Sequence, residues 1–168
     1  MPPATDLAHA SPARAATPLW RLAIRSLATP LLMSAICWLG AGVNYLLFHT
    51  LAELFSIVIA MVAIVVVTTA QRFTRNHFAV YIAVAIGWCG GLDLLHMLVF
   101  KGMHLLPGDS ANPATQLWVA ARFIQAVALV TAPLLLHHRI RPLQAHAGFG
   151  MVALVSVALI TTGLFPTA

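Results

Sequence analysis

The stretch FAVYIAVAIGWCGGLDLLHMLVF, from Phe78 to Phe100, decides the fold of this chain. It is apolar for longer than the roughly 20 residues that a helix needs to cross the hydrocarbon core of a bilayer. It also carries one carboxylate, that of Asp93, and one imidazole, that of His96. The stretch therefore predicts a transmembrane helix. Because burying a charge in hydrocarbon is costly, its polar side chains are candidate functional residues.

The composition of the whole chain agrees with a membrane protein. Of its 168 residues, 61% are hydrophobic and 8% are charged, whereas about 25% of the residues of a soluble domain are charged. This excludes a soluble globular domain, a disordered tail, a nucleic-acid-binding module and a disulfide-stapled secreted scaffold. The two cysteines, Cys37 and Cys89, lie in different apolar stretches without a CxxC spacing, so we interpret them as small packing residues.

Four further stretches reach the spanning length, so the predicted fold class is all-α, a polytopic membrane bundle of five helices. The predicted spans are 30–48, 51–70, 78–100, 114–136 and 147–165. Residues 1–28 are expected to form a disordered, juxtamembrane N-terminus, residues 29–165 the membrane domain and residues 166–168 a tail. Three helix starts have capping chemistry, namely Thr29-Pro30, Asn112-Pro113 and the capping box from Thr50 to Glu53.

The basic residues predict the orientation of the bundle. Lys101 is the only one in the connections on one side, whereas the other side has seven: Arg14, Arg21, Arg25, Arg72, Arg75, Arg139 and Arg141. The positive-inside rule then places the N-terminus inside, the 101–113 loop outside and, with five spans, the C-terminus outside. The short tail after residue 162 leaves no room for a cytoplasmic output region. We therefore expect either a fragment of a longer protein or a chain that acts through partners.

The candidate site consists of the ionisable residues inside the apolar stretches: His49, Glu53, Asp93, His96 and Arg122. Asp93 and Arg122 lie about 10 and 12 Å from the outer ends of the third and fourth spans, which are antiparallel. We therefore predict a structural ion pair between Asp93 and Arg122. His96 follows Asp93 by one turn, and His49 and Glu53 lie at a similar level, which predicts a polar pocket in the outer leaflet.

Simpler interpretations of these residues stay open. Glu53 could only complete its capping box, Asp93 and Arg122 could only form a structural clasp, and His96 could only make an interhelical hydrogen bond.

Two other features concern packing. The pair Gly87 and Gly91 has the G-x-x-x-G spacing that lets another helix approach, within the chain or in a homodimer, and Pro133 predicts a kink in the fourth span.

Three stretches resemble the signature regions of the third-type membrane-associated sensor domain of the MASE series. They are HTLAELFSIVIA (49–60), LDLLH (92–96) with KGM (101–103), and ATQLWVAAR (114–122). The resemblance covers roughly residues 30–165, and it departs from the family pattern at Phe100, where a tyrosine is common. It implies an N-terminal integral-membrane input domain of bacterial diguanylate cyclases, phosphodiesterases or histidine kinases. It thus implies the bacterial inner membrane, and cyclic-di-GMP or two-component signalling through a cytoplasmic output domain or partner.

Three functions remain in consideration from the residues. The first is a sensor whose pocket binds a small ligand or ion from the outer side and shifts helix packing. The second is a bis-histidine haem b or metal site with His49 and His96 as ligands, for redox or gas sensing or electron transfer. The third is a transporter, which the apolar inner half of every span disfavours. An enzyme is not expected, because no nucleophile has an adjacent base.

Overall fold

A computed structural model describes residues 19–74, 77–103, 111–135 and 140–167 of the chain. The chain divides into two compact units, Met1–Ile36 and Cys37–Ala168. All regular elements within the described residues are helices, which confirms the predicted all-α class. Within the described part of the chain, five helical segments are long and apolar enough to cross a membrane, as predicted.

The first helix, α1, spans Leu19–Val43 and begins well before the predicted start at Pro30. Pro30 lies inside α1 and not in its first turn, so the predicted Thr29-Pro30 cap is wrong. The segment that precedes Pro30 is rich in leucine, alanine and arginine, which have high helix propensity. A proline inside a membrane helix is tolerated when neighbouring groups satisfy the carbonyl that it leaves free.

The second helix, α2, spans Tyr45–Thr74 and begins six residues before the predicted start at Leu51. Its first turn is capped by Asn44, whose Oδ1 accepts a hydrogen bond from the backbone N–H of Leu46 at 2.7 Å. The capping box predicted at Thr50 and Glu53 is wrong, because both residues lie inside α2. The side chain of Glu53 is therefore free to take part in a site.

The third and fourth helices lie close to their predicted positions. α3 spans His77–Val99 and α4 spans Asn112–Thr131. The N-cap of α4 is Ala111 and not the predicted Asn112. After α4 the chain continues as a short 3-10 helix, η1 (Ala132–Leu135), which contains Pro133. The regular α-helix thus ends where the proline was expected to disturb it.

The fifth helix, α5, spans Pro142–Thr161, so the predicted span 147–165 is placed too late. Two local signals set its ends. At the start, the Arg141 N–H donates to Gln144 Oε1 at 3.2 Å, and Pro142 occupies the first turn. At the end, Gly163 has a φ of 72°, and the N–H groups of Leu164 and Phe165 donate to the Leu159 carbonyl. The chain therefore turns before it reaches Phe165.

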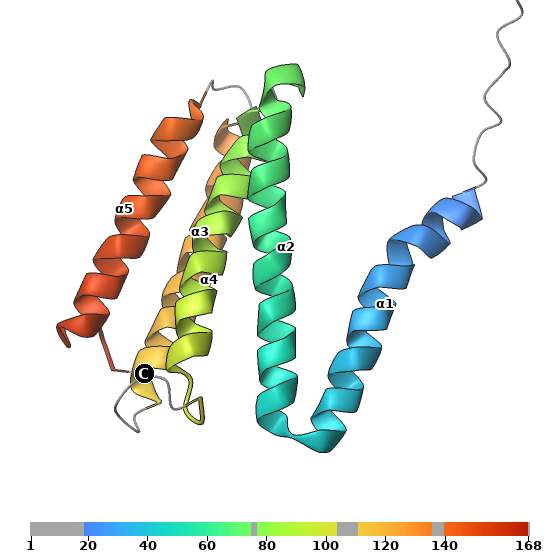
Figure 1. Cartoon of the computed structure of the whole chain (residues 1–168). Coiled ribbons are helices and arrows are strands. Elements are labelled where there is room, and N and C mark those ends of the chain that lie inside the picture. The colour runs from blue at the N-terminus through green and yellow to red at the C-terminus, as the bar shows by residue number, and fades with distance from the viewer. Residues whose placement is uncertain (1–18, 75–76, 104–110, 136–139, 168) are drawn as a thin grey trace, which may run out of the picture. The chain divides into compact units, whose positions relative to one another are not determined.

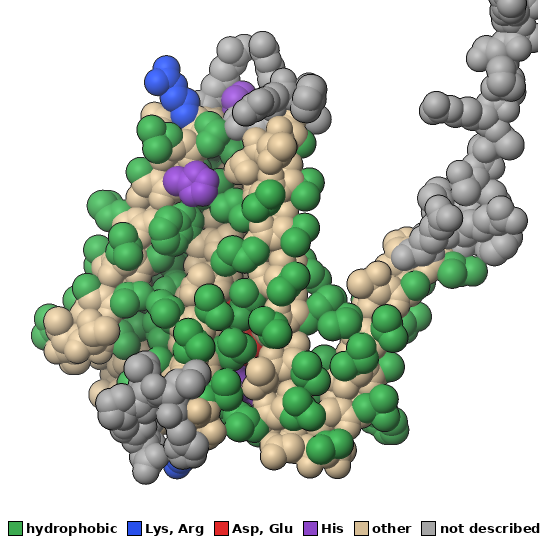
Figure 2. Space-filling view, viewed as in Figure 1, with side chains coloured by type: hydrophobic (Ala, Val, Ile, Leu, Met, Phe, Trp, Pro, Cys, Tyr) green, Lys and Arg blue, Asp and Glu red, His purple; other side chains and the backbone are tan. Residues whose placement is uncertain are grey.

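The central element of the unit Cys37–Ala168 is α3, which packs against α2, α4 and α5 (Figure 1). Half of the residues in the stretch of α3 that could cross a membrane are buried, a larger share than in the corresponding stretch of any other described helix. The buried core includes Val80, Val84, Leu92, Ala121 and Ile124. Hydrophobic side chains are spread over the visible face of these helices, with few charged side chains among them (Figure 2), as expected for a surface in contact with lipid tails.

Glycines of α3 and α5 allow close helix approach. A Cβ atom on Gly87 would lie 2.6 Å from Ile64 Cδ1, and one on Gly90 would lie 2.8 Å from Ala60 Cβ, both on α2. A Cβ on Gly150 of α5 would lie 2.7 Å from the Trp88 ring of α3. Gly91 has open space beside it. The predicted close approach of another helix is confirmed at Gly87 within the chain, but the second glycine that contacts α2 is Gly90 and not Gly91.

Candidate functional site

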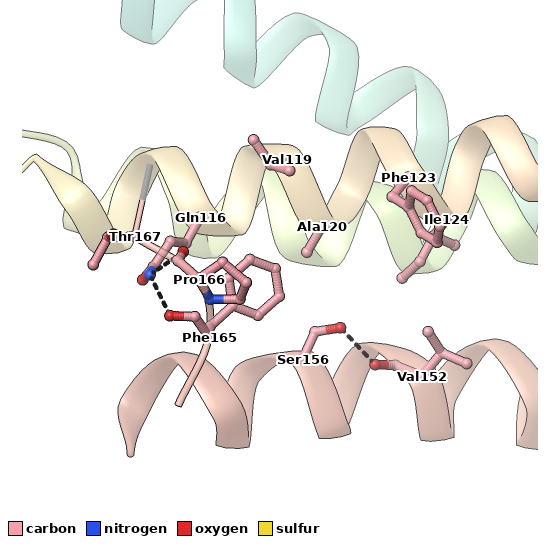
Figure 3. A pocket seen from close by; sticks show the side chains of 10 residues that line it. All are labelled: Gln116, Val119, Ala120, Phe123, Ile124, Val152, Ser156, Phe165, Pro166 and Thr167. Atoms are coloured by element: carbon pink, nitrogen blue, oxygen red, sulfur yellow. Dashed lines mark hydrogen bonds between the residues drawn. The ribbon is translucent and has the colours of Figure 1, made fainter. Parts of the chain in front are cut away.

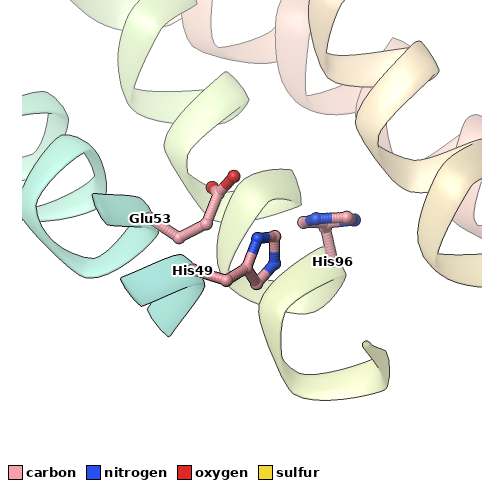
Figure 4. Close-up of side chains that lie close together, drawn as sticks. All are labelled: His49, Glu53 and His96. Carbon is pink, nitrogen blue, oxygen red and sulfur yellow. The ribbon is translucent and has the colours of Figure 1, made fainter. Parts of the chain in front are cut away.

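Two histidines and a carboxylate meet between α2 and α3, and we call them the histidine cluster: His49, Glu53 and His96 (Figure 4). One potential ligand atom from each residue lies within 4.8 Å of the others. His49 and Glu53 share a face of α2 because they are four residues apart, and His96 lies in the last turns of α3. The cluster thus joins two helices near the end of the bundle that carries the α3–α4 connection.

His96 is held in one orientation by the neighbouring helix. It is buried, with 6% of its surface exposed, and its Nδ1 lies 2.7 Å from the carbonyl oxygen of Ala114 on α4. A carbonyl oxygen can only accept, so Nδ1 carries the proton in the neutral imidazole. Nε2 is then left with its lone pair. An imidazole fixed in this way by a backbone carbonyl is the usual arrangement of a metal-ligating histidine.

His49 is enclosed by other rings. Its ring stacks on Phe100 with centroids 3.9 Å apart, and it meets the His96 ring edge-on at 5.6 Å. Tyr45 lies on the same face of α2, with its ring centroid 6.1 Å from that of His49. The Nε2 atom of His49 is buried and has no hydrogen-bond partner among the described residues. Leaving a buried polar atom unpaired is unfavourable, so binding of a ligand or an ion to this atom is favoured.

Asp93 and Arg122 meet between α3 and α4, as predicted from their depths. The Arg122 Nη2 donates to Asp93 Oδ2. The Asp93 side chain is 9% exposed and the Arg122 side chain 39%, so the carboxylate is the more deeply buried partner. The guanidinium carbon of Arg122 also lies 6.0 Å from the centroid of the Trp118 ring, one turn earlier on α4. The sequence analysis did not single out Trp118, although its spacing of four residues from Arg122 could have indicated this contact.

A small cavity with a mixed polar and apolar lining adjoins this ion pair. It has a volume of about 130 Å³ and is lined by Ser56, Cys89, Gly90, Asp93, Arg122 and Gln125, among others. Asp93 Oδ1 and Arg122 Nε are buried, and neither has a hydrogen-bond partner within the described residues beyond the contact named above for other atoms of the pair. One water takes about 30 Å³ in the liquid, so the cavity has room for a few waters or a very small polar ligand.

A larger, mostly apolar cavity of about 550 Å³ lies between α4 and α5 (Figure 3). Gln116 lies at one end, and its Nε2 donates to the carbonyls of Phe165 at 3.3 Å and Pro166 at 2.9 Å. The side chain of Gln116 is buried, and it ties the end of the described chain to α4. Sequence reasoning did not single out Gln116, because a lone glutamine gives no signal until its partners are known.

The structure thus brings the five predicted site residues into two adjoining groups. The histidine cluster lies between α2 and α3, and the Asp93–Arg122 pair lies between α3 and α4. Asp93 and His96, three residues apart on α3, connect the groups. At the start of α3, away from the site, His77 contacts the Ile140 carbonyl through Nδ1 at 3.0 Å. His137 and His138 lie outside the described residues.

These features define a class of protein: a helical, multi-pass membrane protein with a buried polar site and an otherwise apolar bundle. The sequence matches the membrane-associated sensor domain family MASE3 over residues 41–168. The chain belongs to this family, and the expected resemblance is confirmed. No curated protein and no solved structure matches the chain. The family assigns a sensory, signal-input role to the domain.

Proposed function

We propose that this membrane sensor domain detects its signal at the polar site formed by the histidine cluster and the Asp93–Arg122 pair. The proposal is supported by three buried polar atoms that have no hydrogen-bond partner within the described part of the apolar bundle: His49 Nε2, Asp93 Oδ1 and Arg122 Nε. A site that leaves such atoms unpaired gains free energy when a ligand or ion binds them. In an ion pair with a purely structural role, in contrast, the buried polar atoms normally all have hydrogen-bond partners.

The location of the site suggests how binding is transmitted. α3 contributes both His96 and Asp93, and these residues contact α4 through Ala114 and Arg122. α2 contributes His49 and Glu53. A ligand that draws these groups together therefore favours one packing of α2 and α4 on α3. Such a ligand shifts the population of packing states only by its difference in affinity for them.

The orientation follows from the positive-inside rule. We propose that the end of the bundle with the site and the α3–α4 connection faces outward, and that Arg141 lies on the cytoplasmic side. The signal then arrives from outside the bacterial inner membrane. The response is passed to a cytoplasmic signalling enzyme of cyclic-di-GMP metabolism or to a histidine kinase. The domain itself carries out no catalysis in this proposal.

The proposal is tested by measuring signalling in the bacterium that carries the chain. Cyclic-di-GMP is quantified by mass spectrometry, and phosphorylated response regulators are resolved on phosphate-affinity gels. Wild-type chain is expected to change one of these outputs relative to cells without it. Glu53→Gln and the double variant Asp93→Asn, Arg122→Gln should abolish the change at equal membrane levels.

His146→Gln is the matched control, because it removes a histidine of α5 that is not part of the site. It should respond like the wild type. Outputs that are the same for the wild type and the site variants would contradict a sensory role for these residues.

A further inference from the structure

We propose that the histidine cluster binds a divalent first-row transition-metal ion through His49, Glu53 and His96. The inference rests on the proposed function and names the chemical class of ligand for the same site. Two imidazoles and one carboxylate are the donor set that zinc and iron(II) sites commonly use, and an incomplete set of three protein ligands leaves a position for water. Magnesium and calcium prefer oxygen ligands alone.

The distances allow a single ion after a small movement. The three potential ligand atoms lie within 4.8 Å of one another. Around a tetrahedral zinc ion with bonds of about 2.0–2.1 Å, neighbouring ligand atoms lie roughly 3.3 Å apart. Each separation therefore has to shorten by up to about 1.5 Å, which side-chain rotations and a small shift between α2 and α3 can supply. Any part of this shortening that side-chain rotation does not supply has to come from movement of α2 toward α3, which is a change in helix packing.

The protonation and orientation of the ligands also agree with an ion. The Ala114 carbonyl holds the proton of His96 on Nδ1, which leaves Nε2 free to coordinate. The Nε2 of His49 is buried and has no hydrogen-bond partner in the part of the chain that the structure describes. The structure therefore offers one coordinating nitrogen whose orientation is fixed and one that lacks any other partner.

The surroundings favour a bare ion over a haem. A haem iron between two imidazoles would place a wide porphyrin ring in the space between His49 and His96. Glu53 already brings a carboxylate oxygen within 4.8 Å of the histidine ligand atoms. Phe100 stacks directly on His49, with ring centroids 3.9 Å apart. A small ion fits among these groups, whereas a porphyrin would have to displace them.

The cluster lies where an ion from water can reach it. His49 is in the second turn of α2, and His96 precedes the end of α3 by three residues. Lys101 and Gly102, directly after α3, are exposed. His49 and Glu53 are themselves only partly buried. An ion can thus enter at the end of the bundle without crossing the hydrocarbon core.

The test uses the full chain in nanodiscs, after a chelator has removed any bound metal. Zn²⁺ is added, excess is removed by desalting, and bound zinc is measured by mass spectrometry. Co²⁺ is titrated in parallel, because its visible absorption reports coordination by nitrogen and oxygen ligands. We expect one ion per chain, displacement of Co²⁺ by Zn²⁺ and no displacement by Mg²⁺.

Three variants remove one ligand each: His49→Gln, Glu53→Gln and His96→Asn. The last keeps a donor that can reach the Ala114 carbonyl but removes Nε2. Each should lower the affinity at least about 100-fold, since loss of a mere outer-shell partner already costs 10–100-fold. His146→Gln should bind like the wild type.

Absence of zinc and cobalt from the wild type, or equal binding by the Glu53→Gln variant, would overturn the ion site. The cellular signalling response, cyclic-di-GMP or response-regulator phosphorylation, is measured in a separate experiment. A response that persists without metal binding refutes only the ion, whereas metal binding without any response refutes only the proposed function.

Discussion

The imidazole Nδ1 of His96 on α3 lies 2.7 Å from the carbonyl oxygen of Ala114 on α4. This one contact connects the histidine cluster to the helix that carries Arg122. His96 therefore contacts two helices. Its Nδ1 side contacts α4, and its other side faces His49 and Glu53 of α2. A single buried side chain of α3 thus contacts both α2 and α4.

The Asp93–Arg122 pair should stabilise the bundle. Asp93→Asn or Arg122→Gln leaves the other charge without its partner in an apolar setting, and each is expected to cost several kcal/mol. The melting temperature of the purified protein in detergent should fall for both single variants. The double variant should be less destabilised than the sum of the two, because no lone charge remains. Unchanged melting temperatures for both single variants would show that the pair does not contribute to stability.

The glycines of α3 should respond differently although they are adjacent in sequence. Gly90→Ala places a Cβ 2.8 Å from Ala60 Cβ, so it should lower the melting temperature. Gly91→Ala meets no atom within 4 Å and should be neutral or stabilising by up to about 1 kcal/mol through helix propensity. Thermal unfolding of the two variants side by side checks this. An equal effect of the two substitutions would mean that α2 does not approach α3 at Gly90.

The amide of Gln116 should hold the last described residues against α4. Gln116→Leu removes the donor to the Phe165 and Pro166 carbonyls but keeps a side chain of similar size. Hydrogen exchange in residues 163–167 should become faster, while exchange in the middle of α3 stays unchanged. Slow exchange in 163–167 of the variant would show that other contacts suffice to hold this segment.

The proposed orientation predicts which connections are accessible from outside. In a background with Cys37→Ala and Cys89→Ser, a membrane-impermeant thiol reagent applied to intact spheroplasts should label Ser110→Cys. It should label Leu143→Cys, at the start of α5, only after the membrane is opened. The opposite pattern would invert the orientation of the whole bundle.

The helices could be predicted from the sequence because their signal is physical and local. A stretch as apolar as 78–100 must be buried in lipid or protein, and five such stretches account for the five helices. The helix ends were less predictable. The pattern from Thr50 to Glu53 satisfies a capping box, but the same residues occur inside helices, and the Asn44 side chain caps α2 instead.

The candidate residues could also be predicted, because a charge within an apolar stretch is conspicuous. Their depths along antiparallel helices were enough to bring Asp93 and Arg122 together. The partners of His96 and Gln116 are backbone carbonyls of other segments, Ala114 for one and Phe165 and Pro166 for the other. Every residue has a carbonyl, so no pattern in the sequence marks which of them will accept such a bond.

The most direct test of the account is a distance measurement between helices by pulsed electron paramagnetic resonance. Spin labels are placed at Val62→Cys on α2 and Leu129→Cys on α4, both exposed on the outside of the bundle, in the background with Cys37→Ala and Cys89→Ser. The protein is studied in nanodiscs with and without Zn²⁺. We expect zinc to shift the distribution of distances between the two spin labels and the Glu53→Gln variant to abolish this shift. An identical distribution in both conditions, in protein shown to have bound zinc, would contradict a site that senses by changing helix packing.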